Sequence, residues 1–156
     1  MDGLYLAIIG IASAVIFSGI GSAIGLFYSG AACAGVMTED PKNFGKYLML
    51  FALPGTQGIY GFAIAFLMML KLKIIGGPIP SLTVSQGLNI LFACLPVAFA
   101  GLGSGINQGK VCASGIYLTL RQPNEVGKAL VLGVFVELYA VLGLLISFFM
   151  WMGLKI

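Results

Sequence analysis

Four long apolar stretches, separated only by three short breaks, leave this chain few possible folds. The stretches lie near 4–37, 44–70, 85–120 and 127–154, and each exceeds the ~20 residues that a helix needs to cross a bilayer. In lipid the backbone N–H and C=O groups must be satisfied within the segment, so each stretch is predicted to be a helix. The sequence therefore predicts an all-α membrane protein with four transmembrane helices, of which the first and third are long enough to project beyond the membrane.

Composition removes several other classes of protein. With 60% hydrophobic and 8% charged residues, the 156-residue chain cannot present the charged surface of a soluble domain. No basic run suits nucleic acid, and no phosphate-cradling motif suits ATP hydrolysis, so we expect neither a nucleic-acid partner nor an enzyme. There is no histidine, and the cysteines lack the spacing of a zinc or redox site, so they are predicted to be packing residues. The first run is too long for a signal-peptide core and has no basic start, so we expect it to be retained as a helix.

The chain repeats itself with a single offset of 82 residues. Matched positions include Gly19-Ile20-Gly21-Ser22 with Gly101-Leu102-Gly103-Ser104, Pro41 with Pro123, and Gly45-Lys46 with Gly127-Lys128. One ungapped offset across both halves indicates a tandem duplication, with a first helical hairpin at 1–80 and a second at 81–156. Each repeat has two spans, so the halves enter the membrane in the same direction, and such units suit assembly into a ring.

Small residues mark the first and third spans. Glycines recur at four-residue spacing, at Gly21 and Gly25 and again at Gly101, Gly105 and Gly109. This spacing lets helix backbones approach closely. It is compatible with generic helix packing, and also with a tight inner layer formed by the first and third helices and covered by bulkier second and fourth helices.

Glu137 is the one carboxylate well inside a predicted span. It lies ten residues into the fourth stretch, or roughly 15 Å below the helix start. An unpaired charge at this depth costs several kcal/mol, so an intramembrane acid indicates a functional site. The structural alternative is a protonated glutamate that hydrogen-bonds to a neighbouring helix.

Other oxygen-bearing residues fall at a comparable depth. Gln57 and Gln108 lie a similar distance from the same membrane side, and one face of the second helix carries Leu53, Thr56, Gln57 and Tyr60. A carboxylate, two amide oxygens and a hydroxyl are hard donors that suit a hard cation. Pro54 lacks an N–H and bends the helix, which can turn a backbone carbonyl toward a ligand.

Three segments make the resemblance to a known family specific. They are Leu53-Pro54-Gly55-Thr56-Gln57-Gly58-Ile59-Tyr60-Gly61, Gly105-Ile106-Asn107-Gln108-Gly109-Lys110 and Val136-Glu137-Leu138-Tyr139-Ala140. Over essentially its whole length the chain resembles the proteolipid (K, or c) subunit of the membrane rotor ring of V-type ATPases, above all the bacterial sodium-translocating ones. Asn107 departs from that pattern, because a small residue is expected at its position.

The resemblance implies a site and a mode of action. It implies that Glu137 binds Na+ with side-chain oxygens of Thr56, Gln57 and Gln108 and the Leu53 carbonyl, and that Tyr60 closes the site by a hydrogen bond to Glu137. ATP hydrolysis on other subunits would turn a ring of identical protomers in a bacterial cell membrane. At the offset of 82, Glu137 falls on Gly55, so each protomer carries one site across four helices, a ratio that favours pumping over ATP synthesis.

The resemblance also implies partners besides membrane lipid. A stator membrane subunit would compete for Glu137 with a basic residue, and a central-stalk subunit would meet the loops at 38–43 and 121–126. Four basic residues on the side of these loops against three on the other side weakly favour a cytoplasmic location for them. Lys110 receives no ion-binding role, and Tyr5 and Trp151 are interpreted as interfacial aromatics.

Three alternatives stay open on the sequence. The same ring could translocate H+, since a proton site needs only the carboxylate and a dry surround. The chain could be a small secondary transporter that works as a monomer or dimer. It could also be a purely structural proteolipid.

Overall fold

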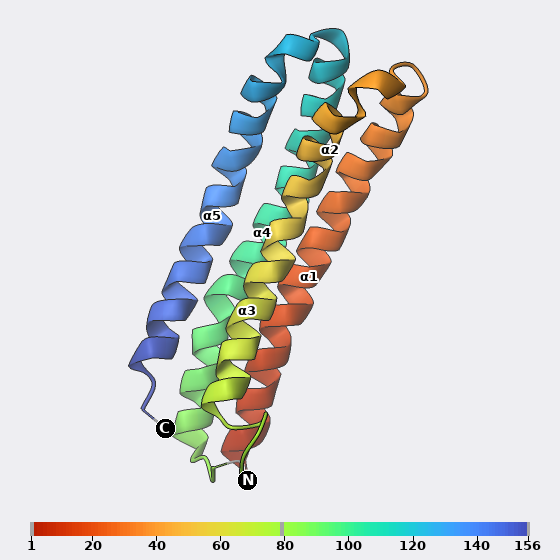
Figure 1. Ribbon diagram of the computed structural model, residues 1–156. Coiled ribbons are helices and arrows are strands. Elements are labelled where there is room, and N and C mark those ends of the chain that lie inside the picture. The colour runs from red at the N-terminus through yellow and green to blue at the C-terminus, as the bar shows by residue number, and fades with distance from the viewer. Residues whose placement is uncertain (1, 79, 156) are drawn as a thin grey trace.

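The computed structural model describes residues 2–78 and 80–155 as four long rods of helix (Figure 1). The elements are α1 (Asp2–Met37), α2 (Phe44–Ala52), α3 (Thr56–Lys71), α4 (Val84–Arg121) and α5 (Val126–Gly153), and the described residues contain no strand. Four segments are long and apolar enough to cross a membrane: Gly3–Met37, Pro41–Lys71, Val84–Arg121 and Pro123–Gly153. The predicted all-α class and the four spans are thus confirmed.

The two longest helices exceed the membrane thickness, as the sequence predicts. The 36 residues of α1 and the 38 residues of α4 correspond to about 54 and 57 Å of helix, against ~30 Å of hydrocarbon. Thr83 begins α4 with a capping box in which its hydroxyl accepts from the Gln86 N–H and the Gln86 side chain accepts from the Thr83 N–H. The predicted hairpin boundary at 80/81 falls between the end of α3 and the start of α4, and it stays a prediction.

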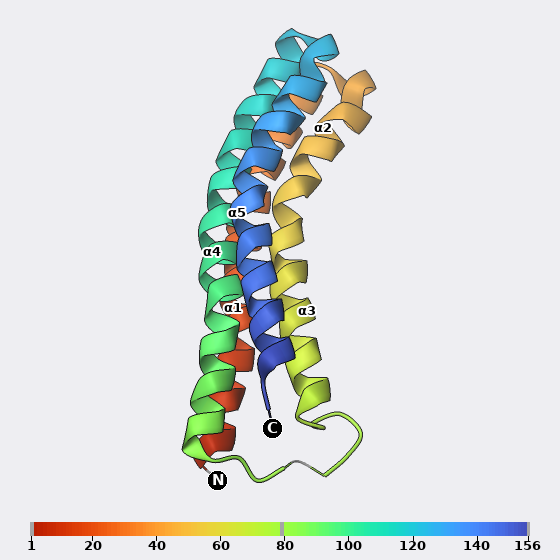
Figure 2. The ribbon, with the colours of Figure 1, turned by 90° about the vertical axis from the view of Figure 1, so that its left-hand side faces the viewer.

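Glycine brings α1 and α4 together backbone to backbone. A Cβ on Gly21 would lie 2.5 Å from the Gly101 carbonyl oxygen, and a Cβ on Gly105 would lie 2.6 Å from the Gly21 carbonyl carbon. No side chain fits between the helices at these levels, so the small-residue spacing marks a tight pair rather than generic packing. Figure 2 shows α1 and α4 as one layer, with α3 and α5 beside them as the other.

The second span is bent rather than straight. Pro54 interrupts it with one 3-10 turn at Leu53–Gly55, which separates α2 from α3, and the change of direction is visible in Figure 2. Proline has no N–H to bond the carbonyl four residues back, which explains the break. The bend lies one helical turn from Glu137 along the bundle, because the Leu53 side chain reaches Gly133 of α5 whereas Tyr60, further along α3, bonds Glu137.

Two apolar clusters fill the bundle, one toward each end. The cluster near the chain termini includes Ala14, Ile64, Met68, Ile90 and Val97, and the cluster near the opposite loops includes Val36, Tyr47, Leu50, Cys112 and Ile116. Cys33, Cys94 and Cys112 are buried and free, as expected of packing residues. The polar residues singled out by the sequence lie between the two clusters.

Trp151, interpreted from the sequence only as an interfacial aromatic, also makes contacts with α3. Its Nε1 donates to the Leu67 carbonyl oxygen at 3.1 Å, and its own carbonyl accepts from Lys71 Nζ at 2.6 Å. The Lys71 ammonium also lies 5.2 Å from the centroid of the indole ring, within the range of a cation–π contact. Trp151 therefore joins the ends of α3 and α5.

Candidate ion-binding site

Glu137 lies midway along α5 and receives hydrogen bonds from two other helices. The Tyr60 hydroxyl of α3 donates to Glu137 Oε1 at 2.6 Å, and Gln108 Nε2 of α4 donates to Glu137 Oε2 at 3.3 Å. Glu137 and Tyr60 are half-buried, whereas Gln108 is fully buried. Each carboxyl oxygen thus has one donor, and the carboxylate stays close to the lateral surface of the bundle.

The two glutamines lie behind the carboxylate as a bonded pair. Gln57 Nε2 donates to Gln108 Oε1 at 2.6 Å, and Gln108 Nε2 also donates to the Gly133 carbonyl at 3.0 Å. Both side chains have no solvent exposure. Two buried amides held from three helices form a rigid polar centre in an otherwise apolar bundle.

One oxygen of this centre has no partner. Among the buried side-chain N and O atoms of the described residues, Gln57 Oε1 alone lacks a hydrogen bond. Leaving a buried acceptor unsatisfied costs about 1–3 kcal/mol, and native proteins rarely tolerate it without a functional reason. An amide oxygen at this position can coordinate a hard cation.

Leu53 and Thr56 form the wall next to Gln57. The Thr56 hydroxyl donates to the Leu53 carbonyl at 3.0 Å, and the Thr56 backbone N–H bonds to the same oxygen. The Leu53 side chain reaches α5, because a Cβ on Gly133 would lie 3.1 Å from Leu53 Cδ1. These hydrogen bonds join the two residues to each other and not to Glu137, so their role as ion ligands stays a prediction.

The structure adds two groups that sequence reasoning missed. Ser104 accepts from Gln57 Nε2 at 3.3 Å and donates to the Val136 carbonyl at 2.9 Å, directly before Glu137. The Gly133 carbonyl, one helical turn earlier on α5, fixes the Gln108 amide. The repeat held a signal for Ser104, since its counterpart Ser22 also bonds the other helix of its hairpin, by accepting from the Gly58 N–H at 2.7 Å.

The first hairpin keeps the geometry of this site without its chemistry. Gly55 takes the place of Glu137 and Leu26 takes the place of Gln108 at the offset of 82. A Cβ on Gly55 would lie 3.7 Å from Leu26 Cδ1, so the two positions face one another as Glu137 and Gln108 do. Lys110 lies apart from both positions, with its Nζ 5.7 Å from the centroid of the Tyr28 ring.

Comparison with known proteins matches the chain to one family twice. The family described as the C subunit of ATP synthase matches residues 9–68 and 91–150, and these ranges differ by the same 82 residues as the internal repeat. The double match confirms the tandem duplication of the hairpin.

Curated relatives align over nearly all of the chain. The V-type sodium ATPase subunit K of Enterococcus hirae is 48% identical over 146 residues, which cover 94% of this chain and 90% of that one. The A-type ATP synthase subunit K of Methanocaldococcus jannaschii is 38% identical, over 98% of this chain and 64% of the relative. The 16 kDa proteolipid of the V-type proton ATPase of Nephrops norvegicus is 31% identical, over 94% and 90%. These matches confirm the resemblance inferred from the three sequence segments, and the chain belongs to the ATP synthase C-subunit family of membrane proteolipids.

Proposed function

We propose that this chain is a subunit of the rotor ring of a V-type ATPase, and that it carries Na+ across the membrane on Glu137. The observation that carries the ion assignment is the buried, unpartnered oxygen of Gln57, whose amide is linked through Gln108 to a carboxylate that already has a donor on each of its oxygens. A proton site needs no such oxygen. A sodium site does, because Na+ is a hard cation and oxygen ligands must take the place of the water around it.

Charge neutrality makes rotation possible in this proposal. A bare carboxylate at the centre of a bilayer costs several kcal/mol, whereas a carboxylate that holds Na+ presents no net charge to lipid. Tyr60 covers the carboxylate from α3, while Gln57 and Gln108 approach it from inside the bundle. The loaded protomer can then pass through lipid, and a basic residue of a stator subunit releases the ion by competing for Glu137.

The ends of the two hairpins are suited to meet the central stalk. The loops at 38–43 and 121–126 lie at the same end of the bundle (Figure 1), and Lys46 Nζ donates to the Pro123 carbonyl at 3.0 Å. Lys128 pairs with Glu125 at 2.6 Å beside them. This end carries more basic side chains than the other, which favours the cytoplasmic side. ATP hydrolysis takes place on other subunits.

Carbodiimide labelling of the detergent-extracted ring tests for Na+. The reagent attacks a protonated, unoccupied carboxyl, so we expect Na+ to slow the labelling of Glu137 and K+ to have no effect. Gln57→Ala and Gln108→Ala each remove a side-chain oxygen that the proposal assigns to Na+, worth about 1.5–3 kcal/mol. The Na+ concentration that gives half-maximal protection of Glu137 should therefore rise roughly tenfold or more. Gln122→Ala, in the exposed loop, is the matched control and should leave it unchanged. Labelling that follows pH alone, in all variants, would replace Na+ by H+ as the transported ion.

Tyr60→Phe tests how the site is closed. The ring of phenylalanine keeps the packing of Tyr60 but loses the hydroxyl that donates to Glu137 Oε1 at 2.6 Å. We expect the ring to assemble normally and the Na+ concentration for half-maximal protection to rise roughly tenfold or more, because a hydrogen bond to a charged group is worth about 1.5–3 kcal/mol. Tyr117→Phe, at an exposed position of α4, should behave as wild type. Unchanged protection in Tyr60→Phe would remove Tyr60 from the closure of the site.

A further inference from the structure

The amide of Gln108 can face only one way. Its Nε2 lies 3.0 Å from the Gly133 carbonyl oxygen and 3.3 Å from Glu137 Oε2. A backbone carbonyl and an ionised carboxylate accept hydrogen bonds and have no proton to donate. An amide oxygen in the place of Nε2 would therefore face two other oxygens with no proton between them. Gln108 thus directs its NH2 group toward α5 and leaves its Oε1 for α3.

This orientation of Gln108 determines the orientation of Gln57. Gln57 Nε2 lies 2.6 Å from Gln108 Oε1. Because Gln108 offers an acceptor there, Gln57 must offer an N–H, and its own oxygen stands at the other end of the amide. That oxygen has no hydrogen-bond partner in the described part of the chain. One N–H of the same NH2 group is still to be accounted for.

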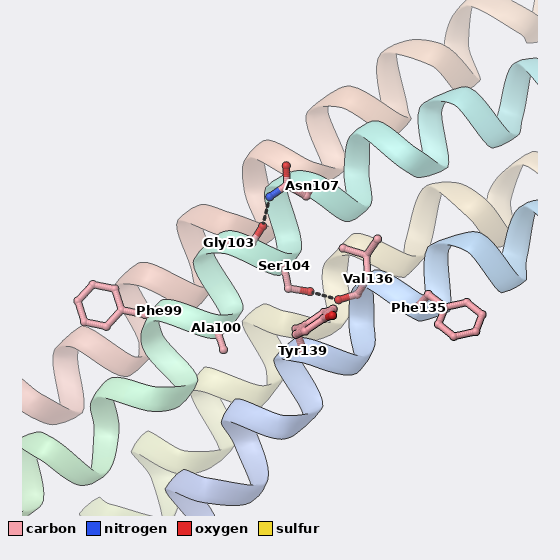
Figure 3. Close-up of a pocket in the computed structure, with 8 residues that line it drawn as sticks. All are labelled: Phe99, Ala100, Gly103, Ser104, Asn107, Phe135, Val136 and Tyr139. Carbon is pink, nitrogen blue, oxygen red and sulfur yellow. Dashed lines mark hydrogen bonds between the residues drawn. The ribbon is translucent and has the colours of Figure 1, made fainter.

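Ser104 receives this second N–H. Gln57 Nε2 donates to Ser104 Oγ at 3.3 Å, while the Ser104 hydroxyl donates its own proton to the Val136 carbonyl at 2.9 Å. Figure 3 shows Ser104 extending from α4 toward α5, with the bond to Val136 in a groove that the two helices line. A hydroxyl whose proton is engaged has only lone pairs left to offer. Ser104 is therefore an acceptor for Gln57 and cannot bond its oxygen.

Two bonded N–H groups fix the plane of an amide. Ser104 and Gln108 are four residues apart, so they are neighbours on one face of α4 and reach the two hydrogens of the same NH2 group. With the bond to Gln108 alone, the Gln57 amide could rotate about that bond and its oxygen would move. The bond to Ser104 removes this freedom.

We propose that Ser104 is a positioning residue of the sodium site, which acts through Gln57. By accepting from Gln57 Nε2, it keeps Gln57 Oε1 free of other partners and in a fixed position for the ion. Ser104 does not itself touch Na+ in this arrangement. The proposal rests on the sodium site of the proposed function, and it adds the residue that decides which end of a buried amide meets the cation.

Asn107 takes no part in this arrangement. Its Nδ2 donates to the Gly103 carbonyl at 2.8 Å, and its side chain is exposed. Figure 3 shows the Asn107 amide folded back against its own helix, whereas Ser104 points toward α5. The residue that departs from the family pattern thus keeps its amide on the outer surface of α4, apart from Gln57.

Ser104→Ala tests the role of the hydroxyl. The variant deprives one Gln57 N–H of its acceptor and releases the plane of the amide, so the Na+ concentration for half-maximal protection of Glu137 should rise about two- to tenfold. Ser147→Ala is the matched control. Ser147 is also buried and also joins α5 to α4, by accepting from the Val97 N–H at 3.0 Å, but it lies about 15 Å from Glu137 along α5. Half-maximal protection of Ser104→Ala at the wild-type Na+ concentration would overturn the proposal.

A double-mutant cycle tests whether Ser104 acts through Gln57. In a Gln57→Ala background there is no amide to orient, so adding Ser104→Ala should not raise the half-maximal Na+ concentration further. A residue that bound Na+ directly, or that merely supported the packing of α4 on α5, would show its full effect in both backgrounds. Equal effects of Ser104→Ala with and without Gln57 would therefore exclude the positioning role.

The pH dependence of labelling without Na+ separates an effect on Gln57 from an effect on Glu137. Ser104→Ala leaves the bonds from Tyr60 and Gln108 to Glu137 in place, so the pH at which half of Glu137 is labelled should equal that of the wild type. A shifted midpoint would mean that Ser104 acts on Glu137 through the Val136 carbonyl, and it would refute the route through Gln57.

Nuclear magnetic resonance of the unmodified ring tests the orientation without a substitution at position 104. The side-chain signals that disappear in Gln57→Ala identify Gln57. Addition of Na+ to the wild type should shift the Gln57 side-chain carbonyl carbon, while both of its N–H protons keep the shifts of hydrogen-bonded groups. Release of an N–H on addition of Na+, with the carbonyl carbon unmoved, would show that the amide faces the other way.

The two proposals can fail separately. Wild-type rings whose Glu137 labelling ignores Na+ would refute the sodium assignment and with it the role of Ser104. Wild-type rings that Na+ protects, together with Ser104→Ala rings that are protected at the same Na+ concentration, would refute the role of Ser104 and leave the proposed function intact.

Discussion

Glu137→Gln should abolish coupled ion transport and leave the assembled ring intact. The glutamine amide is nearly isosteric with the carboxylate, and its oxygen can still accept from the Tyr60 hydroxyl that bonds Glu137 Oε1 at 2.6 Å. It has no charge to balance a cation, however, and an uncompensated charge in the bilayer costs several kcal/mol. Since about 1.4 kcal/mol is a factor of ten in binding, we expect transport to fall at least a hundredfold.

Ion uptake by the complete complex in vesicles measures this effect. Glu125→Gln is the matched control, because Glu125 lies in the loop before α5 and pairs with Lys128 at the surface. We expect the control to pump normally and both variants to yield rings of wild-type mass. Pumping near the wild-type rate by Glu137→Gln would remove this carboxylate from the centre of the mechanism.

Gly25→Leu should prevent the two hairpins of the chain from packing. A Cβ at position 25 would collide with the Gly105 carbonyl oxygen and would lie 2.7 Å from Pro54 Cβ. Neither neighbour is the flexible end of a side chain, so α1 and α4 must separate. Overpacking of a tight interior typically costs about 1–3 kcal/mol, and a collision between backbones belongs at or above the upper end.

The yield and thermal stability of the detergent-extracted assembly measure this second effect. Gly35→Leu is the control on the same helix, because a Cβ there meets nothing within 4 Å. We expect Gly25→Leu to give little or no assembled ring and Gly35→Leu to assemble. An assembly of Gly25→Leu with a Tm within a few degrees of wild type would contradict the close packing of α1 on α4.

The sequence was sufficient for the architecture because lipid restricts the choices. Charged residues, Pro41 and Pro123 delimit the spans, and backbone satisfaction in lipid makes each one a helix. The glycine spacing left generic packing and a tight pair of the first and third helices both open. The structure shows the tight pair of α1 and α4, since only glycine permits contact between their backbones.

The interior of the site was harder to predict from the sequence. Glu137 and Tyr60 were singled out, and the structure joins them by a hydrogen bond. The parts played by Ser104 and the Gly133 carbonyl were not found, because they depend on how α4 and α5 are rotated against each other. Helical periodicity fixes which residues share a face but not which face meets a neighbouring helix.

The apolar clusters on either side of the polar centre make the bundle an electrical insulator. Side chains such as Ile64, Met68 and Ile90 fill one end, and Val36, Leu50 and Ile116 fill the other. In the proposed function, an ion at the half-buried Glu137 therefore has no water-filled passage along the bundle axis toward either aqueous phase, and it exchanges through the side of the bundle. Rings reconstituted alone should not conduct, and current should appear only when a second membrane protein supplies aqueous access to the carboxylate from each side.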